Sequence, residues 1–401
     1  MSDSGGPTPP SERIVSLDAL RGFALLGILV INIRLFSMPE VVLFNPTAYG
    51  DFTGANYLAW LGGHVFAEQK FITLFTYLFG AGVILFADSA ERKGESALSL
   101  HVRRNLWLVV FGLAHAYLLW YGDILVRYGL CALFVFFYRN HAAGALARLG
   151  IVLLAIPSAL EILTALSSDP AAIASSWQPA EAVIRAEIET YQSGWLAQMD
   201  HRVETSINRQ TVGFVFSTFW RVTGAMLLGM ALYKWGVITN ERSTGFYRRL
   251  VLAGGASGLA LTVAGVWFIE ASGWAAGAAL YWQQFFYWGS FLLAAAYVGV
   301  IMLFTRRWGD GRVTGALAAV GRTAFSNYLL QTVIATSIFY GHGLGLFGQV
   351  SRAEALGIVA AIWVFQVALS VLWLRYFRFG PMEWLWRALT YGKRYPIRKE
   401  R

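Results

Sequence analysis

In two apolar stretches of this sequence, an arginine is followed at the same interval by a histidine or an asparagine. Arg104 is followed eleven residues later by His115, and Arg21 is followed after the same interval by Asn32. Eleven residues make about three helical turns, so the members of each pair share one helix face and lie about 16 Å apart. Histidine is the natural general base near neutral pH, and an asparagine amide can stabilise an oxyanion. The spacing therefore places an arginine near one end of each helix and, further along the same face, a side chain that could act as a base or as a hydrogen-bond donor.

A third set of polar residues occurs nearer the C-terminus. Arg322 precedes Asn327 and Gln331, which are four residues apart and therefore neighbours on one helix face. Glu68 lies close to the start of another apolar stretch. Ionisable groups inside a membrane are costly and usually face the interior of a helix bundle. These four side chains are therefore further candidates for a functional site.

Each candidate also has a structural interpretation. His115 could be a buried histidine with satisfied hydrogen bonds, since most buried polar groups are satisfied in that way. Asn327 and Gln331 could form hydrogen bonds between helices. Asp123 and Arg127, four residues apart, suggest a structural ion pair within one helix.

The elements that must position these side chains are membrane-spanning helices. Apolar types make up 57% of the 401 residues and charged types 14%, against about 25% charged residues in a soluble domain. The single cysteine, Cys131, excludes a disulfide framework, and the absence of zinc and phosphate-loop motifs predicts no metal site. A span needs about 20 mostly apolar residues. The sequence thus predicts an all-α integral membrane bundle of about ten spans, at 19–37, 69–88, 104–120, 124–139, 146–167, 212–233, 250–271, 281–304, 316–340 and 355–377.

The basic residues predict the orientation of this bundle. With the N-terminus in the cytoplasm, 22 Lys and Arg residues fall on the cytoplasmic side of the ten spans and 4 on the outer side. Cytoplasmic loops carry such an excess, so both termini are predicted to be cytoplasmic. The same excess accounts for the net charge of +9, so no nucleic-acid partner is predicted. The predicted segments are a disordered tail (1–15), the bundle (16–380) with an outer amphipathic segment (168–211), and a cytoplasmic, amphipathic and basic C-terminal segment (381–401).

Several motifs resemble those of one family of bacterial membrane proteins. They are Ser16-Leu17-Asp18-Ala19-Leu20-Arg21-Gly22, Gly112-Leu113-Ala114-His115-Ala116, Gly122-Asp123-Ile124-Leu125, Gly321-Arg322-Thr323-Ala324-Phe325-Ser326-Asn327-Tyr328 and Glu383-Trp384-Leu385-Trp386-Arg387. On these motifs the sequence is similar to the YeiB family (domain of unknown function 418) along almost its whole length. That family looks like a branch of the transmembrane acyltransferases, which include the heparan-α-glucosaminide N-acetyltransferases. The resemblance implies transfer of an acyl group from cytoplasmic acyl-CoA to an acceptor at or beyond the outer face.

One position departs from the pattern of the bacterial glycan acyltransferases. Those enzymes typically have histidine where this sequence has Asn32. Here the same spacing of arginine and histidine occurs instead as Arg104 and His115. We therefore expect the histidine chemistry to have moved to another helix.

These observations predict an acyltransferase of the bacterial inner membrane that uses acyl-CoA, such as acetyl-CoA, as co-substrate. Its partners would be the lipid bilayer and a small-molecule, lipid-linked or glycan acceptor, and a homo-oligomer is compatible with the sequence. The candidate catalytic residues, with His115 as general base or transient acyl carrier, are His115, Asn32, Glu68, Asn327 and Gln331. The candidate residues for the phosphates of CoA, all at cytoplasmic helix ends, are Arg21, Arg104 and Arg322.

Two other functions fit the same polar residues. A transporter or flippase for a small or lipid-linked substrate is the main alternative, because intramembrane arginine and asparagine side chains would suit a translocation path equally well. A non-catalytic membrane scaffold is the third.

Overall fold

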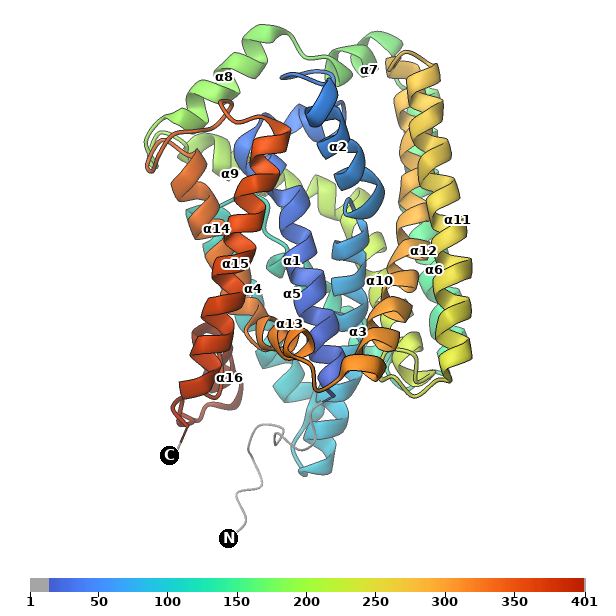
Figure 1. The fold of residues 1–401 in the computed structure, drawn as a ribbon, viewed down its shortest axis with the longest axis vertical. Coiled ribbons are helices and arrows are strands. Elements are labelled where there is room, and N and C mark those ends of the chain that lie inside the picture. The colour runs from blue at the N-terminus through green and yellow to red at the C-terminus, as the bar shows by residue number, and fades with distance from the viewer. Residues whose placement is uncertain (1–13, 400–401) are drawn as a thin grey trace.

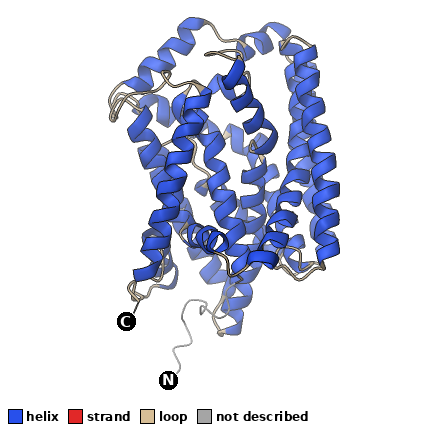
Figure 2. Ribbon diagram, in the orientation of Figure 1, coloured by secondary structure: helices blue, strands red, loops and turns tan. Residues whose placement is uncertain are grey.

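The protein is a helical bundle whose long helices run side by side (Figures 1 and 2). The computed structural model describes residues 14–399, and within them the only extended pairing is an isolated bridge between Phe377 and Arg398. The helices, in chain order, are α1 (Val15–Ser37), η2 (Glu40–Leu43), α2 (Gly54–Phe66), α3 (Lys70–Arg92), α4 (Ala97–Leu118), α5 (Leu125–Val135), η3 (Phe136–Tyr138), α6 (Ala143–Ser167), α7 (Pro170–Trp177), α8 (Glu181–Gln192), α9 (Met199–Gln210), η4 (Phe214–Thr218), α10 (Phe219–Lys234), α11 (Thr244–Ala271), α12 (Ala276–Trp308), α13 (Arg312–Arg322), α14 (Ala324–Phe339), α15 (Arg352–Tyr376) and α16 (Pro381–Tyr391).

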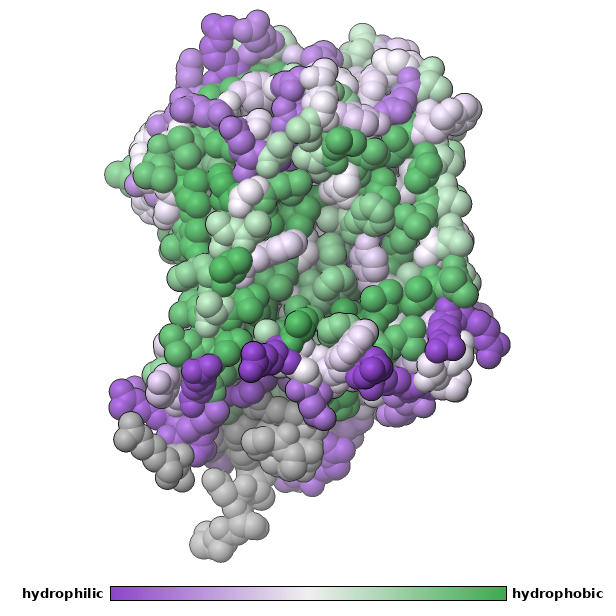
Figure 3. All heavy atoms as spheres, in the orientation of Figure 1, coloured by the Kyte–Doolittle hydropathy of each residue, from purple (hydrophilic) through white to green (hydrophobic). Residues whose placement is uncertain are grey.

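The chain is a multi-pass membrane protein, as the sequence predicts. Seven helical segments of the described chain are long and apolar enough to cross a membrane, with α2–α3 and α9–α10 each counted as one. Figure 3 shows the matching surface, an apolar band with polar residues gathered at both ends. The other three predicted spans correspond to helices that are shorter or more polar, namely α4, α5 with η3, and α14.

The predicted span 316–340 is not one helix. It divides at Thr323, whose φ of −114° and ψ of 28° lie outside the helical region, into α13 and α14. In Figure 1, α13 lies across the bundle near the end that carries α16, which we call the lower end. Helix α13 packs so closely against α1 that a Cβ atom on Gly321 would lie 1.9 Å from the carbonyl oxygen of Asp18. The break lets α13 pack crosswise against α1 while α14 continues along the bundle.

A second interrupted helix lies between α2 and α3. The sequence predicted no membrane span between residues 37 and 69, whereas α2 lies in this segment and stacks above α3 in Figure 1. The chain between them, from Ala67 to Gln69, leaves the helical conformation, and Gln69 has a φ of 61°. A break of this kind within a membrane protein is tolerated where it is buried in protein.

Helices α7 and α8 lie across the opposite, upper end of the bundle (Figure 1). The side chain of Asn45 donates to the Trp177 carbonyl at 3.0 Å, and the backbone N–H of Glu40 donates to the Glu187 carboxylate at 2.9 Å. The predicted outer segment, 168–211, is helical, because it contains α7, α8 and α9. The predicted helix at the start of 381–401 is α16, and most of the predicted tail, residues 1–13, lies outside the described residues.

Candidate functional site

A cavity of about 940 Å³ opens in the lower half of the bundle. Its walls include α1, α3 and α4 from the N-terminal third of the chain and α13, α14 and α16 from the C-terminal quarter. Two acidic residues, Asp18 and Glu383, are among its lining. Seven basic residues line it, namely Arg21, Arg92, Lys93, Arg104, Arg322, Arg378 and Arg387. The three arginines predicted from the sequence to bind one anion thus meet in a single, strongly basic cavity.

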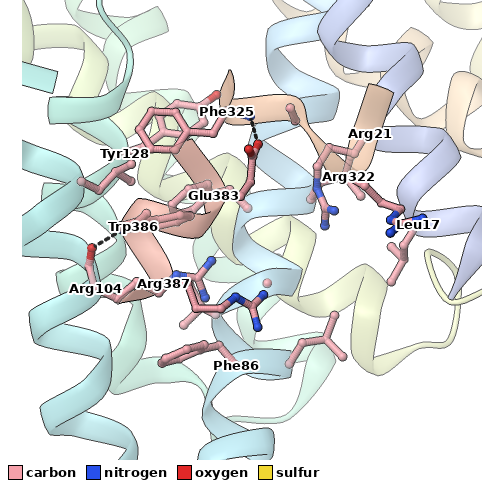
Figure 4. A pocket seen from close by; sticks show the side chains of 18 of the residues that line it. Leu17, Arg21, Phe86, Arg104, Tyr128, Arg322, Phe325, Glu383, Trp386 and Arg387 are labelled. Carbon is pink, nitrogen blue, oxygen red and sulfur yellow. Dashed lines mark hydrogen bonds between the residues drawn. The ribbon is translucent and has the colours of Figure 1, made fainter. Parts of the chain in front are cut away.

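The arginines of the cavity come from opposite sides of it. Figure 4 shows Arg21 and Arg322 on one side and Arg104 and Arg387 on the other. The Arg21 guanidinium pairs with Asp18 at 2.9 Å, three residues earlier on α1. Arg322 donates to the carbonyl of Arg378 at 3.4 Å. Both guanidinium groups thus have partners that hold them in place within the described residues.

Arg104 is held by aromatic rings. Its guanidinium carbon lies 4.6 Å from the centre of the Phe86 ring and 4.5 Å from that of Trp386. The indole N–H of Trp386 donates to the Arg104 carbonyl at 2.8 Å. Stacking of this kind suits the planar guanidinium, because its N–H groups point outward in the guanidinium plane and can still donate hydrogen bonds there. Helix α16, which the sequence did not predict to form part of the site, thus fixes one of the predicted binding residues.

Helix α16 is fixed to the bundle by Glu383. Its carboxylate accepts hydrogen bonds from the backbone N–H groups of Phe325 and Ser326 and from the Ser326 hydroxyl. These N–H groups belong to the first turn of α14, which has no partners for them within the helix. Burial raises the pKa of the Glu383 carboxyl, although these hydrogen bonds act in the opposite direction. The contact fixes α16 in place as one wall of the cavity.

The cavity changes character towards the middle of the bundle. Helix α1 contributes Asp18 and Arg21 near its lower end but Leu25 and Ile28 further up. Helix α4 likewise contributes Arg104 lower down and Leu108 one turn above it. The remaining lining of the upper part is mostly aromatic or aliphatic, with Phe75, Phe79, Ile124, Leu125, Tyr128 and Tyr328. The cavity is therefore basic at one end and mostly apolar at the other.

His115 lies directly behind the upper end of the cavity. The His115 ring is 5.0 Å from the ring of Tyr328, which lines the cavity. His115 is buried, with its Nδ1 2.9 Å from Asp123 Oδ1 and its Nε2 2.9 Å from Thr332 Oγ1. The predicted pairing of Asp123 with Arg127 is wrong, because no such ion pair forms among the described residues and Asp123 binds His115 instead.

The other predicted catalytic residues lie away from the cavity lining. Asn327 donates to the hydroxyl of Ser370 at 2.8 Å, and Gln331 donates to the side chain of Gln366 at 3.0 Å. Both partners are on α15, so these two residues join α14 to α15, which is the packing role considered for them. Asn32 is half-buried on α1 and does not belong to the described cavity lining.

Glu68 belongs to a separate buried cluster at the break between α2 and α3. Its carboxylate lies 2.9 Å from His64 Nδ1 and 3.7 Å from Arg34, and Lys70 donates to the His64 carbonyl at 2.6 Å. The His64 ring stacks on Trp60. Sequence reasoning missed His64, because the 13-residue helix that carries it is too short to be recognised as a span.

Comparison with known proteins identifies the family. The family model described as "Protein of unknown function (DUF418)" matches residues 232–393. The chain is 34% identical to the uncharacterized protein YeiB of Escherichia coli (strain K12), over 94% of this chain and 96% of that protein. The chain belongs to the DUF418 family. It is also 32% identical to the uncharacterized protein YxaH of Bacillus subtilis (strain 168), over 98% of both chains. An uncharacterized 39.9 kDa protein of Bacillus acidopullulyticus is 29% identical over 98% of this chain and 97% of its own.

The resemblance to the YeiB family that was inferred from the motifs is therefore confirmed. The residues that match the DUF418 model contain α11 to α16, and so include Arg322, Arg378 and Arg387 of the cavity. Arg21 and Arg104 lie outside that range, in the part of the chain covered by the similarity to YeiB.

Proposed function

We propose that this protein is a membrane-embedded acyltransferase that takes an acyl group from acyl-CoA and transfers it to an acceptor at the membrane or its outer face. The observation that carries the proposal is the cavity, basic at its lower end and apolar at its upper end, which stops one ring away from His115. A ligand that fits it has a polyanionic head and a long, less polar arm. Acyl-CoA has this form, with its phosphates at one end and its thioester at the other.

The charge of the cavity supports binding of phosphates. Among the described residues that line the cavity, seven are basic and two are acidic, so this lining carries an excess of positive charge. Arginine binds phosphate oxygens through paired N–H donors, and such charge-assisted hydrogen bonds are stronger than neutral ones. Asn105, with 1% of its surface exposed, also lines the cavity, and its Oδ1 has no hydrogen-bond partner among the described residues. An amide N–H group of the ligand arm would satisfy this oxygen.

The pair of His115 and Asp123 supports proton transfer. An ionised carboxylate only accepts hydrogen bonds, so Asp123 Oδ1 accepts from the Nδ1–H of His115. The second carboxylate oxygen accepts from the backbone N–H of Val126 at 2.9 Å, which fixes its orientation. Nε2 of His115 then carries the lone pair. A histidine held in this tautomer is prepared to act as a general base.

The same proposal includes an orientation in the membrane. The lower end, with the basic cavity and the basic residues around α16, would face the cytoplasm, where acyl-CoA is found, and both termini would lie there. The chain would cross the bacterial inner membrane about ten times if α4, α5 with η3, and α14 are added to the seven long spans. The excess of basic residues at this end supports the orientation.

A transporter is the second candidate, and the break between α2 and α3 favours it. Interrupted helices with buried charges form substrate and ion sites in many transporters. Here Arg34, Glu68 and Lys70 lie buried at such a break. The sequence has no fixed-period repeat, whereas many transporters are built from inverted repeats, and this difference disfavours a transporter.

Calorimetric titration of the detergent-purified protein with CoA and acetyl-CoA tests the proposal. We expect saturable binding that Arg322→Ala weakens by about 10-fold or more, since a hydrogen-bonded charge pair contributes about 1.5–3 kcal/mol. Arg312→Ala is the matched control, because Arg312 is exposed at the other end of α13 and does not line the cavity. Equal affinities of Arg322→Ala and the parent at low and moderate salt would refute the phosphate site. Absence of CoA binding by the parent would favour the transporter.

A further inference from the structure

We propose that Thr332 is the nucleophile that carries the acyl group, as an acyl-threonine ester formed and broken with His115 as base. This inference rests on the proposed acyl transfer and names the residue on which the acyl group waits between donor and acceptor. It differs from the expectation that His115 itself is the carrier.

The geometry joins a hydroxyl, an imidazole and a carboxylate in one line. Nδ1 of His115 faces Asp123, and Nε2 faces the Thr332 hydroxyl, both at 2.9 Å. Because the Nδ1 proton is directed to Asp123, Nε2 accepts the proton of the Thr332 hydroxyl. Serine and threonine nucleophiles are activated in this way, by a base that a third group orients. The three side chains are 1–2% exposed, so water is excluded from them.

The hydroxyl of Thr332 differs from those of several other buried threonines in this protein. The hydroxyls of Thr76, Thr262 and Thr323 donate to the backbone carbonyl four residues earlier, at 2.7 to 3.0 Å. Thr332 lies in the middle of α14, where the carbonyl of Tyr328 is in the same position relative to it. Within residues 14–399 its hydroxyl is bonded to His115 alone. The hydroxyl is therefore available for activation.

Both nitrogens of His115 are engaged, which argues against an acyl-histidine. For His115 to receive the acyl group directly, Nε2 would have to lose Thr332 and meet the thioester itself. Thr332 needs no such exchange, because its oxygen already faces the base.

The position of Thr332 fits a relay between the cavity and the upper half of the bundle. It lies one turn above Tyr328 on α14, and the Tyr328 ring forms the partition between the cavity and His115. The Tyr328 hydroxyl accepts one hydrogen bond, from the N–H of Ile124 at 3.3 Å. Rotation of this ring would open the upper end of the cavity to Thr332.

The chemistry balances without another reactant. His115 Nε2 takes the proton of Thr332 Oγ1 as Oγ1 attacks the thioester carbonyl carbon; the C–S bond then breaks, and the departing thiolate takes the proton from Nε2. This leaves an ester on Thr332 and free CoA thiol. In the second half, the acceptor hydroxyl or amine attacks the ester carbonyl, its proton goes to Nε2, and the C–O bond to Thr332 breaks. His115 then returns the proton to Thr332 Oγ1.

The test is acid-quenched mass spectrometry of the purified full-length protein after incubation with acetyl-CoA and no acceptor. We expect one acetyl group, mapped to Thr332 and stable to neutral hydroxylamine but removed at alkaline pH, as an oxygen ester is. Thr332→Val, which has a similar shape, should lose the label completely while calorimetric acetyl-CoA binding stays within 2-fold of the parent. Thr332→Ser should keep the label.

The matched control is Thr336→Val, one turn further on α14, where the hydroxyl binds no described group except the carbonyl of Val333. It should retain the label at Thr332. An acetyl group on His115, an unlabelled parent that binds acetyl-CoA, or full labelling of Thr332→Val would each overturn the inference and leave the acyl-CoA site standing. A parent that binds no acetyl-CoA would overturn both. If Thr332→Val does not fold, the position of the label in the parent and in Thr332→Ser decides the question.

Discussion

The contact between α1 and α13 leaves no room for a methyl group, so Gly321→Ala should destabilise the protein and disturb its cavity. A Cβ atom at Gly321 would lie 1.9 Å from the Asp18 carbonyl oxygen, and one at Gly22 would lie 2.0 Å from the Leu317 oxygen. Both obstacles are backbone atoms of rigid helices, which cannot turn aside as a side chain can. The helices carry Arg21 and Arg322, whose guanidinium groups line the cavity.

The expected magnitude follows from the overlap. Non-bonded carbon and oxygen atoms rarely approach closer than 3.0 Å, so α13 must move about 1 Å away from α1. Overpacking costs about 1–3 kcal/mol, and a clash between two backbones belongs at the upper end of this range. Alanine recovers about 1 kcal/mol of helix propensity relative to glycine. We therefore expect a net loss of about 2 kcal/mol in the free energy of unfolding.

Gly315 on the same helix provides the control, because a Cβ atom there would meet no atom within 4 Å. Gly315→Ala should be neutral or stabilising by up to about 1 kcal/mol. Thermal unfolding of both variants in detergent, followed by tryptophan fluorescence, measures the difference. Calorimetry with CoA should show weaker binding for Gly321→Ala alone. Equal stability of the two variants would refute the reasoning about the contact.

Three further predictions concern the upper end, the base and the orientation. Burial raises the pKa of Glu187 to about 7 from its ordinary 4.5, so the folded protein binds this proton more tightly than the unfolded chain. Stability should therefore fall as the pH rises from about 5 to 7. Glu187→Gln should flatten this dependence in thermal unfolding, and an unchanged slope would contradict the assignment. His115→Ala should reduce acyl transfer by about 10²–10⁴-fold with CoA affinity unchanged in calorimetry; near-normal turnover would remove His115 from the mechanism. In intact cells, with the native cysteine replaced, an impermeant thiol reagent should label a cysteine introduced at Ser193 but not one at Arg394, and the reverse pattern would overturn the orientation.

The spans and the arginine cluster were predictable because both depend on local sequence. An apolar run of 20 residues identifies a membrane helix without knowledge of its neighbours. The positions of Arg21 and Arg104 near the same ends of their helices were enough to predict that they meet. Arg322 lines the same cavity as these two residues, although the single helix predicted for 316–340 is wrong.

The features that the sequence did not reveal depend on contacts between distant segments. Thr332 and His115 are 217 residues apart, and nothing in either motif indicates the bond between them. The break at Thr323 lies two residues after Gly321, which packs closely against α1, and hydropathy records neither feature. His64 was overlooked because its helix is short and depends on α3 beneath it.

The way α16 is fastened has a consequence for biosynthesis. The cavity needs α1, which is synthesised before the other described helices, and α16, which is synthesised after them, and Glu383 joins α16 to the beginning of α14. Contacts between such remote segments form late, because the long loop between them must be closed at a cost in entropy. A nascent chain that has inserted all its long helices would still have Arg104 without the indole ring that stacks on it. The basic cavity would therefore be completed only after α16 has been synthesised and has docked on α14.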